Sequence, residues 1–297
     1  MKHGVDISAY QGTVDFDTLK NKVDFVIIRV GYGKNHLDSM FKRNIAEAHR
    51  VGIPYGFYWF SYALSPEDAI NEADYLCDAI KYYEPSYPLC FDYEYDSYNY
   101  ALRNHTNPTE SDIVKIATAF LNRIEERGYY AMNYTNIDFL SRGFKQLVSR
   151  FDTWLAQWAV DKPSKDCGIW QYTSHHKVGG ISGFVDADYA YKDYPTLCKL
   201  VRDRYFEKEG KLNKVVNEIL CGEWGNGEER KQRLIKAGYN YDVVQNLVNK
   251  KIIACNNVAH EVIDGLWGNG EERKLRLEEA GYPYSFIQSL VNAYMQG

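Results

Sequence analysis

Eight short segments rich in β-branched and aromatic residues recur along the first 200 residues, and polar, helix-like stretches separate several of them. The expected strands are 3–8, 25–31, 53–61, 87–94, 129–135, 153–158, 168–173 and 184–189. Helices are expected at 39–52, 65–83 and 109–128, the last capped by Thr109 and ended by Gly128. Strands that alternate with helices predict a parallel sheet, and eight of them in 200 residues predict an α/β fold, a compact (β/α)8 barrel.

The connections in the second half of this region are weaker than those in the first. Residues 136–152 and 159–167 are short and, taken together, rich in Pro, Ser and Lys. Such composition is typical of loops and leaves little room for full helices. We therefore expect an irregular barrel whose later helices are reduced.

The last hundred residues contain an internal repeat. Residues 218–249 and 261–292 align at an offset of 43 residues, and 20 of the 32 aligned positions are identical. Each copy reads as two or three short helices around a Trp-Gly-Asn-Gly turn. A unit of about 40 residues is small for independent stability, so we expect Trp224 and Trp267 in a helical core. The predicted organisation is a barrel domain at 1–200, a polar linker at 201–212 and two small all-α helical-bundle repeats at 213–252 and 256–297.

Composition excludes several classes of function. The net charge of −5 gives no basic footprint for nucleic acid. No stretch approaches about 18 apolar residues, and the first residues lack the apolar core of a signal peptide, so neither a membrane span nor secretion is expected. The histidines and the six cysteines show no metal-ligand spacing, and no phosphate-binding glycine motif occurs in the required context. The sequence therefore predicts no metal, no cofactor and reduced cysteines.

Acidic residues lie at the ends of three expected strands. They are Asp6 in the first strand, Asp92 and Glu94 in the fourth, and Asp186 in the eighth. The carboxyl ends of barrel strands carry the chemistry in this type of fold, and strand alternation places Asp92 and Glu94 on one face. Carboxylates directed into one pocket are costly to bury unless they are hydrogen-bonded or used. The pattern predicts a catalytic set, and paired carboxylates among Tyr and Trp side chains suit glycoside hydrolysis.

Five motifs in these 200 residues resemble those of the glycoside hydrolase family 25 lysozymes. They are GVDIS-x-YQG, the D-x-E of the fourth strand, W-x-A-x-W, IWQYT and G-x-VDAD, and they occur in the expected order. The resemblance implies an irregular barrel that hydrolyses the β-1,4 bond between N-acetylmuramic acid and N-acetylglucosamine in bacterial peptidoglycan.

The same resemblance implies roles for the acids. Glu94 matches the general acid, and Asp92 would orient the 2-acetamido group of the substrate or act at the anomeric carbon. Asp6 and Asp186 would be supporting carboxylates. The sequence leaves open whether the nucleophile is an enzyme carboxylate or the substrate's own acetamide. Trp59, Tyr62, Trp158, Gln171 and Tyr172 are predicted to contact sugar, with plain packing an equally weighted alternative for each.

The C-terminal repeats resemble the type 7 cell-wall-binding repeats of phage lysins, which implies recognition of a peptidoglycan muropeptide. The arginines present in both copies would then pair with muropeptide carboxylates; they are Arg230, Arg233, Arg273 and Arg276. Salt bridges on the helix surface with Glu228 and Glu229 are the alternative. The second copy departs from the pattern at Pro283 and Phe286.

A lytic barrel followed by wall-binding repeats is the layout of a phage endolysin. Such a protein would be made in the cytoplasm of the host bacterium and would reach the wall after the membrane is permeabilised. Two rival readings are a chitinase-like glycosidase and a non-catalytic wall-binding protein. The sequence lacks the longer acidic series expected of a chitinase-like enzyme, because residues 87 and 90 are Tyr and Cys. Whether the repeats also join copies of the chain into a homo-oligomer stays open.

Overall fold

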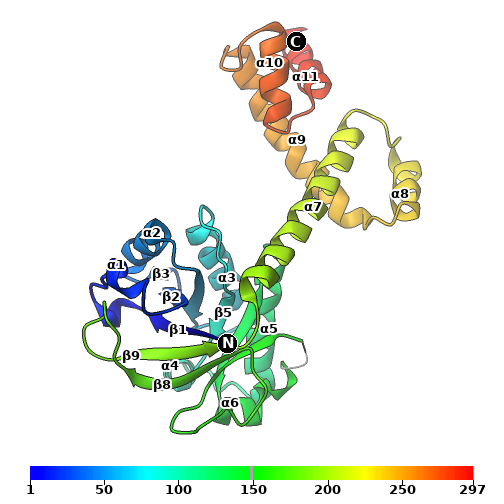
Figure 1. Cartoon of the computed structure of the whole chain (residues 1–297). Helices are drawn as coiled ribbons and strands as arrows, with labels where there is room; N and C mark the ends of the chain where they lie inside the picture. Colours follow the sequence, from blue (N-terminus) through cyan, green and yellow to red (C-terminus); the bar gives the residue numbers. More distant parts are fainter. Residues whose placement is uncertain (148–149, 297) are drawn as a thin grey trace. The chain divides into compact units, whose positions relative to one another are not determined.

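The computed structural model describes residues 1–147 and 150–296 (Figure 1). The chain divides into two compact units, Met1–Arg204 and the residues from Tyr205 onward. Among the described helices, none combines the length and the apolarity that a membrane crossing requires.

The first unit is a closed barrel. Its strands are β1 (Lys2–Ile7), β2 (Phe25–Tyr32), β3 (His36–Leu37), β4 (Tyr55–Phe60), β5 (Leu89–Asp92), β6 (Ala131–Asn136), β7 (Asp152–Ala156), β8 (Ile169–His176) and β9 (Val185–Ala190). Within the described residues they form one sheet in the order β1-β9-β8-β7-β6-β5-β4-β2-β3, and pairing of β1 with β2 closes it. All eight predicted strands are confirmed, and the two-residue β3 is an addition.

The barrel is irregular, as the sequence predicted. Strand β9 runs antiparallel to both of its neighbours, β1 and β8, whereas β1, β2 and β4 to β8 pair in parallel. Residues 157–168, which join β7 to β8, contain no helix. Loops therefore replace helices on part of the barrel wall.

Five helices accompany the first six strands, and they are α1 (Phe16–Leu19), α2 (Phe41–Val51), α3 (Pro66–Ile80), α4 (Tyr95–Arg103) and α5 (Glu110–Glu126). A short α6 (Ile137–Arg142) follows β6. The predicted cap is confirmed: Thr109 and Asp112 form a capping box at the start of α5. Helices α3 and α5 bury Leu76 and Phe120 completely, each worth roughly 2 kcal/mol of apolar burial.

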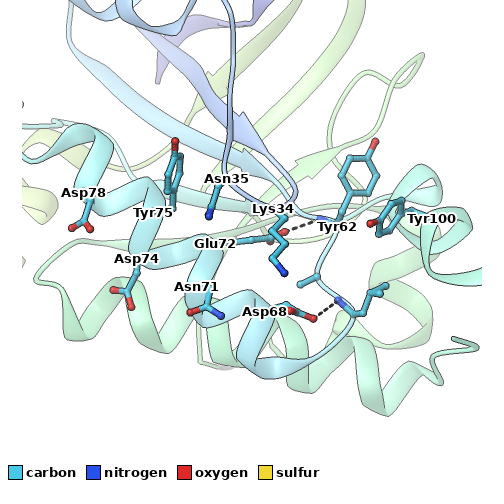
Figure 2. Close-up of a pocket in the computed structure, with 12 residues that line it drawn as sticks. Lys34, Asn35, Tyr62, Asp68, Asn71, Glu72, Asp74, Tyr75, Asp78 and Tyr100 are labelled. Carbon is cyan, nitrogen blue, oxygen red and sulfur yellow. Dashed lines mark hydrogen bonds between the residues drawn. The ribbon is translucent and has the colours of Figure 1, made fainter. Parts of the chain in front are cut away.

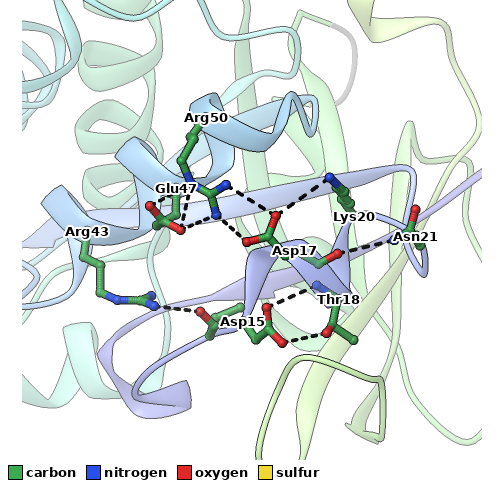
Figure 3. Close-up of polar contacts among 9 residues, drawn as sticks. Asp15, Asp17, Thr18, Lys20, Asn21, Arg43, Glu47 and Arg50 are labelled. Atoms are coloured by element: carbon green, nitrogen blue, oxygen red, sulfur yellow. Dashed lines mark hydrogen bonds and ion pairs between the residues drawn. The ribbon is translucent and has the colours of Figure 1, made fainter.

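Polar contacts fix the segment that follows β1, which includes the turn Ala9–Gln11 and helix α1 (Figure 3). Asp15 caps α1 by accepting from the backbone N–H of Thr18. The guanidinium of Arg43 donates to the carbonyl oxygen of Val14 at 2.9 Å, and that of Arg50 pairs with Asp17 at 2.7 Å. Helix α2 therefore holds in place a segment whose first residues border the pocket described below.

The second unit contains the two repeats. Its helices are the C-terminal part of α7 (Tyr194–Leu220), then α8 (Gly227–Lys236), α9 (Tyr241–Ile263), α10 (Gly270–Glu279) and α11 (Tyr284–Gln296). One apolar cluster centres on Leu234 and Val248, and a second centres on Leu277 and Ile287. The indoles of Trp224 and Trp267 are partly buried against their respective clusters. The two helical bundles of the prediction are confirmed.

The predicted linker at 201–212 is helical, because these residues lie inside the continuous helix α7, and the boundary between the two compact units falls within them. The segment is rich in Arg, Lys and Glu, which favour helix even where no face is buried. In the same way, α9 is both the last helix of the first repeat and the first helix of the second. Helical propensity carries α7 across the first boundary, whereas α9 crosses the second with Val248 buried in one cluster and Cys255 in the other.

Candidate active site

Four predicted acids line one pocket of about 400 Å3 at the carboxyl ends of the barrel strands. Asp6 lies near the end of β1 and directly opposite Asp186 of the antiparallel β9. Asp92 is the last residue of β5, and Glu94 occupies the N-cap position of α4 two residues later. The parallel register and the one antiparallel strand thus bring together carboxylates that lie as much as 180 residues apart.

The two inner carboxylates are deeply buried. Asp6 and Asp92 are each 6% exposed, and Oδ1 of Asp92 has no hydrogen-bond partner in the described part of the chain. Burial raises the pKa of Asp6 well above its usual value, and the charges of Asp188 and Asp186 raise it further. Burial and the neighbouring Glu94 likewise raise the pKa of Asp92. Asp6 and Asp92 therefore have too little contact with water for hydration alone to stabilise their ionised forms.

The two outer carboxylates lie nearer to solvent. Burial raises the pKa of Glu94, and the charges of Asp186 and Asp96 add to the effect, whereas hydrogen bonding from Tyr134 opposes it. Burial raises the pKa of Asp186 to about 6, against the lowering effect of His175. Glu94 therefore combines access from outside with a tendency to keep its proton, which are the two properties of a general acid.

Gln171 connects the acids with the aromatic wall. Its Nε2 donates to Asp6 at 2.9 Å, and its Oε1 accepts from the hydroxyl of Tyr134 at 3.3 Å and from the indole of Trp158 at 3.2 Å. Trp158 is half exposed at the pocket, and Trp154 lies deeper in the lining. Gln171 and Trp158 both line the pocket. Their contact with sugar stays a prediction.

Arg29 supplies the only cation among the described lining residues, and the sequence analysis missed it. Its Nε donates to Asp38 at 2.7 Å, and its guanidinium lies over the rings of Tyr10 and Tyr32. This positive charge opposes the rise in the pKa of Asp92. The available signal was a single arginine inside the apolar strand FVIIRVG.

Asp188 was left out of the predicted set, and the structure buries it completely beneath the pocket. Its Oδ1 accepts from the indole of Trp154 at 2.8 Å, while Oδ2 has no partner within the described residues. Burial raises its pKa well above the usual value, as does the charge of Asp186. Asp188 thus adds to the cluster of acids from below the lining.

Two of the predicted sugar contacts are wrong. Trp59 is fully buried outside the barrel lining, where it packs against Tyr75, because strand alternation directs Tyr58 and Phe60 into the pocket instead. Tyr172 follows Gln171 on β8 and therefore faces the opposite side, where its hydroxyl contacts His3 at 3.1 Å.

Tyr62 lies beside the pocket rather than in it. Its side chain lines a neighbouring groove between α3 and the turn after β2 (Figure 2). Its hydroxyl donates a short hydrogen bond to Asp96, two residues after Glu94. Sugar contact by Tyr62 stays a prediction.

The arginines of the repeats are engaged by their own turns. Nε of Arg230 donates to the carbonyl oxygen of Gly225 at 3.0 Å and a terminal nitrogen donates to Asn226 at 2.9 Å; Arg273 makes the same two contacts in the second copy. Arg233 and Arg276 lie over the indoles of Trp224 and Trp267 and pair with Glu229 and Glu272 at 3.9 and 3.8 Å. All four arginines thus have a structural role within their own repeat. Their contact with a muropeptide stays a prediction.

The chain matches two families of known proteins. The profile of Glycosyl hydrolases family 25 matches residues 5–181, and the CW_7 repeat matches residues 213–252 and 256–295. The second match agrees with the predicted positions of the repeats.

Similar proteins are lysozymes. The chain is 29% identical to the lysozyme of Streptococcus phage Cp-7 over 83% of this chain and 69% of that protein. It is 28% identical to the autolytic lysozyme of Clostridium acetobutylicum over 62% of this chain, and it spans only 54% of that relative.

Solved structures of similar fold include endolysins and autolysins. The catalytic domain of endolysin ply40 from bacteriophage P40 of Listeria monocytogenes is 27% identical, with a TM-score of 0.55, over 68% of this chain and 98% of that one. The modular autolysin LytC from Streptococcus pneumoniae is 30% identical, with a TM-score of 0.55, over 63% of this chain and 46% of that one.

Proposed function

Because the chain belongs to glycosyl hydrolases family 25, we propose that it is a peptidoglycan hydrolase of the lysozyme type. It cleaves the β-1,4 bond between N-acetylmuramic acid and N-acetylglucosamine, and its repeats bind the wall. The observation that carries the proposal is the convergence of Asp6, Asp92, Glu94 and Asp186 in one open pocket. The lysozymes similar to this chain support the choice of substrate.

Glu94 donates the proton. As the bond between the anomeric carbon and the glycosidic oxygen breaks, the proton of Glu94 moves to that oxygen, which leaves as a sugar hydroxyl. The oxygen of a water molecule then bonds the anomeric carbon, and a proton of that water returns to Glu94. The raised pKa of Glu94 supports this role, because the carboxyl keeps its proton at a higher pH than an exposed glutamate. Its position at the start of α4, above the buried acids, supports it as well.

Asp92 stabilises the positive charge that develops at the anomeric centre. It acts on that carbon directly or holds the 2-acetamido group of the substrate in position. The nearby guanidinium of Arg29 favours the ionised form of Asp92, as this role requires. Asp6 and Asp186 support the same centre as neighbouring acids, and Gln171 orients Asp6.

The repeats hold the enzyme on its polymeric substrate. Two similar modules on one chain act by avidity, because the second binding event is intramolecular. The match of both modules to the CW_7 repeat supports this role. Arg233 and Arg276, stacked on indoles at the module surface, are the preferred candidates for contact with muropeptide carboxylates.

Similarity to a phage lysozyme along 83% of the chain supports the further role of an endolysin. In that role the protein is made in the host cytoplasm and reaches the wall after the membrane is permeabilised. Lysis on expression should then require a membrane-permeabilising agent. Association of copies through the repeats is a separate prediction, which light scattering of the full chain would test.

The chemistry is tested by incubating the full chain with purified peptidoglycan and identifying the new reducing ends. Muramic acid ends are expected. Glucosamine ends, or cleavage of chitin, would favour the chitinase-like alternative. A complete absence of new ends would favour a wall-binding protein without catalysis.

A further inference from the structure

A second groove begins beside the catalytic pocket and follows helix α3. It has a volume of about 440 Å3, and its walls come from the turn after β2, from α3, and from residues that follow β4 and Glu94 (Figure 2). The side chains that matter here are Lys34, Asn35, Tyr62, Asn71, Tyr75 and Tyr100. None of them belongs to the lining of the catalytic pocket.

The groove is formed in advance by buried contacts. The carboxylate of Glu72 on α3 accepts from the hydroxyl of Ser61 at 2.6 Å and from the backbone N–H of Tyr62 at 3.1 Å. The backbone N–H of Gly33 donates to the carbonyl oxygen of Phe60 at 2.9 Å. Gly33 has a φ of 52°, and a Cβ there would approach the ring of Tyr62 to 2.8 Å, so glycine allows the turn to reach this ring. The three walls are thus tied together.

Two aromatic residues join the groove to the catalytic pocket. Phe60 lines the pocket, and its ring lies 5.2 Å from that of Tyr62, which lines the groove. The hydroxyl of Tyr62 bonds Asp96, two residues beyond Glu94. A substituent that leaves the pocket across Phe60 therefore meets Tyr62 and then the groove.

The groove presents unused polar groups. Within the described residues, the ammonium of Lys34 and the amides of Asn35 and Asn71 make no hydrogen bond or ion pair, and Figure 2 shows Lys34 and Asn35 directed toward α3. Of the acids along α3, Asp74 and Asp78 are paired with Arg127, and Asp68 accepts from the backbone N–H of Leu64. A cation beside two amides suits a peptide, which offers carboxylate, carbonyl and N–H groups together.

We propose that this groove binds the peptide branch carried by the muramic acid residues of the substrate. Lys34 pairs with a carboxylate of the peptide, and the amides of Asn35 and Asn71 bond its backbone. The inference rests on the proposed function, because that function brings a peptide-bearing sugar into the neighbouring pocket. It explains how the enzyme accommodates a branch too large for the pocket itself.

The test compares two soluble glycans with the full chain. One carries its peptides, and the other has been stripped of them by an amidase. The double variant Lys34→Ala/Asn71→Ala should raise KM on the peptide-bearing glycan about tenfold, since a charged and a neutral hydrogen bond are lost, while kcat stays the same. On the stripped glycan it should match the unaltered chain. Lys34→Arg should restore part of the affinity, and Lys42→Ala, on the exposed face of α2, is the matched control.

Equal losses on both glycans, or no loss on either, would overturn the inference. Failure of the proposed function gives a different result, because the unaltered chain would then cleave neither glycan. In that event calorimetry with the isolated peptide still decides. The unaltered chain should bind more peptide than the double variant, whose repeats are unchanged, and equal binding by the two would count against the groove.

Discussion

The charged residues of the barrel pocket and those of the repeats differ in how the fold satisfies them. In the pocket, Asp92 and Asp188 each keep a buried oxygen without a partner in the described chain, and burial raises the pKa of both. In the repeats, Arg230 and Arg273 are each bonded to a carbonyl and an asparagine of their own turn. The stability of the fold does not explain the buried carboxylate oxygens of the pocket. It does explain the arginines of the repeats, which hold their own turns together. Unsatisfied charge therefore points to chemistry, whereas a repeated charge does not by itself point to a ligand.

The largest expected effect is the loss of cleavage when an acid of the pocket is neutralised but an exposed acid is not. Asp92→Asn should lower the rate of peptidoglycan cleavage by about a hundredfold to ten-thousandfold, because the amide cannot supply the negative charge. Asp161→Asn is the control, since Asp161 is an exposed acid in the loop between β7 and β8 and lines neither the pocket nor the neighbouring groove. The measurement is the rate of appearance of reducing ends. A normal rate for Asp92→Asn would remove the fourth strand from the catalytic site.

A buried acid outside the pocket, Glu72, tests whether burial of a charge costs stability even where the carboxylate is hydrogen-bonded. Burial raises the pKa of Glu72 to about 7. Since the folded protein holds this proton more tightly than the unfolded chain, Glu72 stabilises the fold fully below about pH 4, and this contribution is lost as the pH rises through 7. The loss is about 3 kcal/mol, since each unit of the pKa difference corresponds to about 1.4 kcal/mol.

Glu72→Gln should remove that dependence, because the amide can bond both Ser61 and Tyr62 without ionising. Denaturant unfolding between pH 4 and 8 is the measurement, and Glu67→Gln, on the exposed side of the same helix, is the control. The free energy of unfolding of the Glu72→Gln variant, relative to the unaltered chain, should increase with pH. Parallel curves for the two proteins would mean that Glu72 is not strained by burial.

Removal of the repeats tests the division of labour between the two regions. A chain that ends at residue 204 should cleave soluble muropeptide oligomers at the full rate but whole walls about tenfold more slowly or worse, because avidity is lost. Circular dichroism would check the fold of the shortened chain. Equal wall binding by the short and full chains would deny the repeats a targeting role.

The smallest effect distinguishes the two arginines of a repeat. Arg230→Ala should destabilise the first repeat by about 1 kcal/mol or more, since two hydrogen bonds to the turn are lost. Arg233→Ala removes an exposed ion pair worth about 0.5 kcal/mol or less and should instead weaken wall binding. Thermal unfolding and wall sedimentation measure the two effects. The opposite ranking in sedimentation would make Arg230 the ligand contact.

The sequence predicted the strands and the acids because both depend on local pattern. Each strand is a short apolar run, and an acid at its end is visible without knowledge of the fold. The sequence did not predict which side chains of β4 face the pocket, because YGFYWF is apolar on both faces. Trp59 was therefore assigned to the wrong face. The sequence also did not predict the continuity of α7, because a polar helix has no periodic apolar stripe. Arg29 was missed because its partner Asp38 becomes visible only when the β2–β3 hairpin is formed.

Cleavage by Glu94 and wall binding by the repeats are separate functions of this chain. The Glu94→Gln variant tests this separation directly when both functions are measured on the same preparation. The amide keeps the shape of the side chain but cannot donate the proton, so cleavage should fall by about a hundredfold or more. Binding of the same preparation to isolated walls should equal that of the unaltered chain. A Glu94→Gln variant that keeps more than about a tenth of the cleavage rate would contradict the role of Glu94 as general acid. Loss of wall binding together with cleavage would contradict the separation of the two functions.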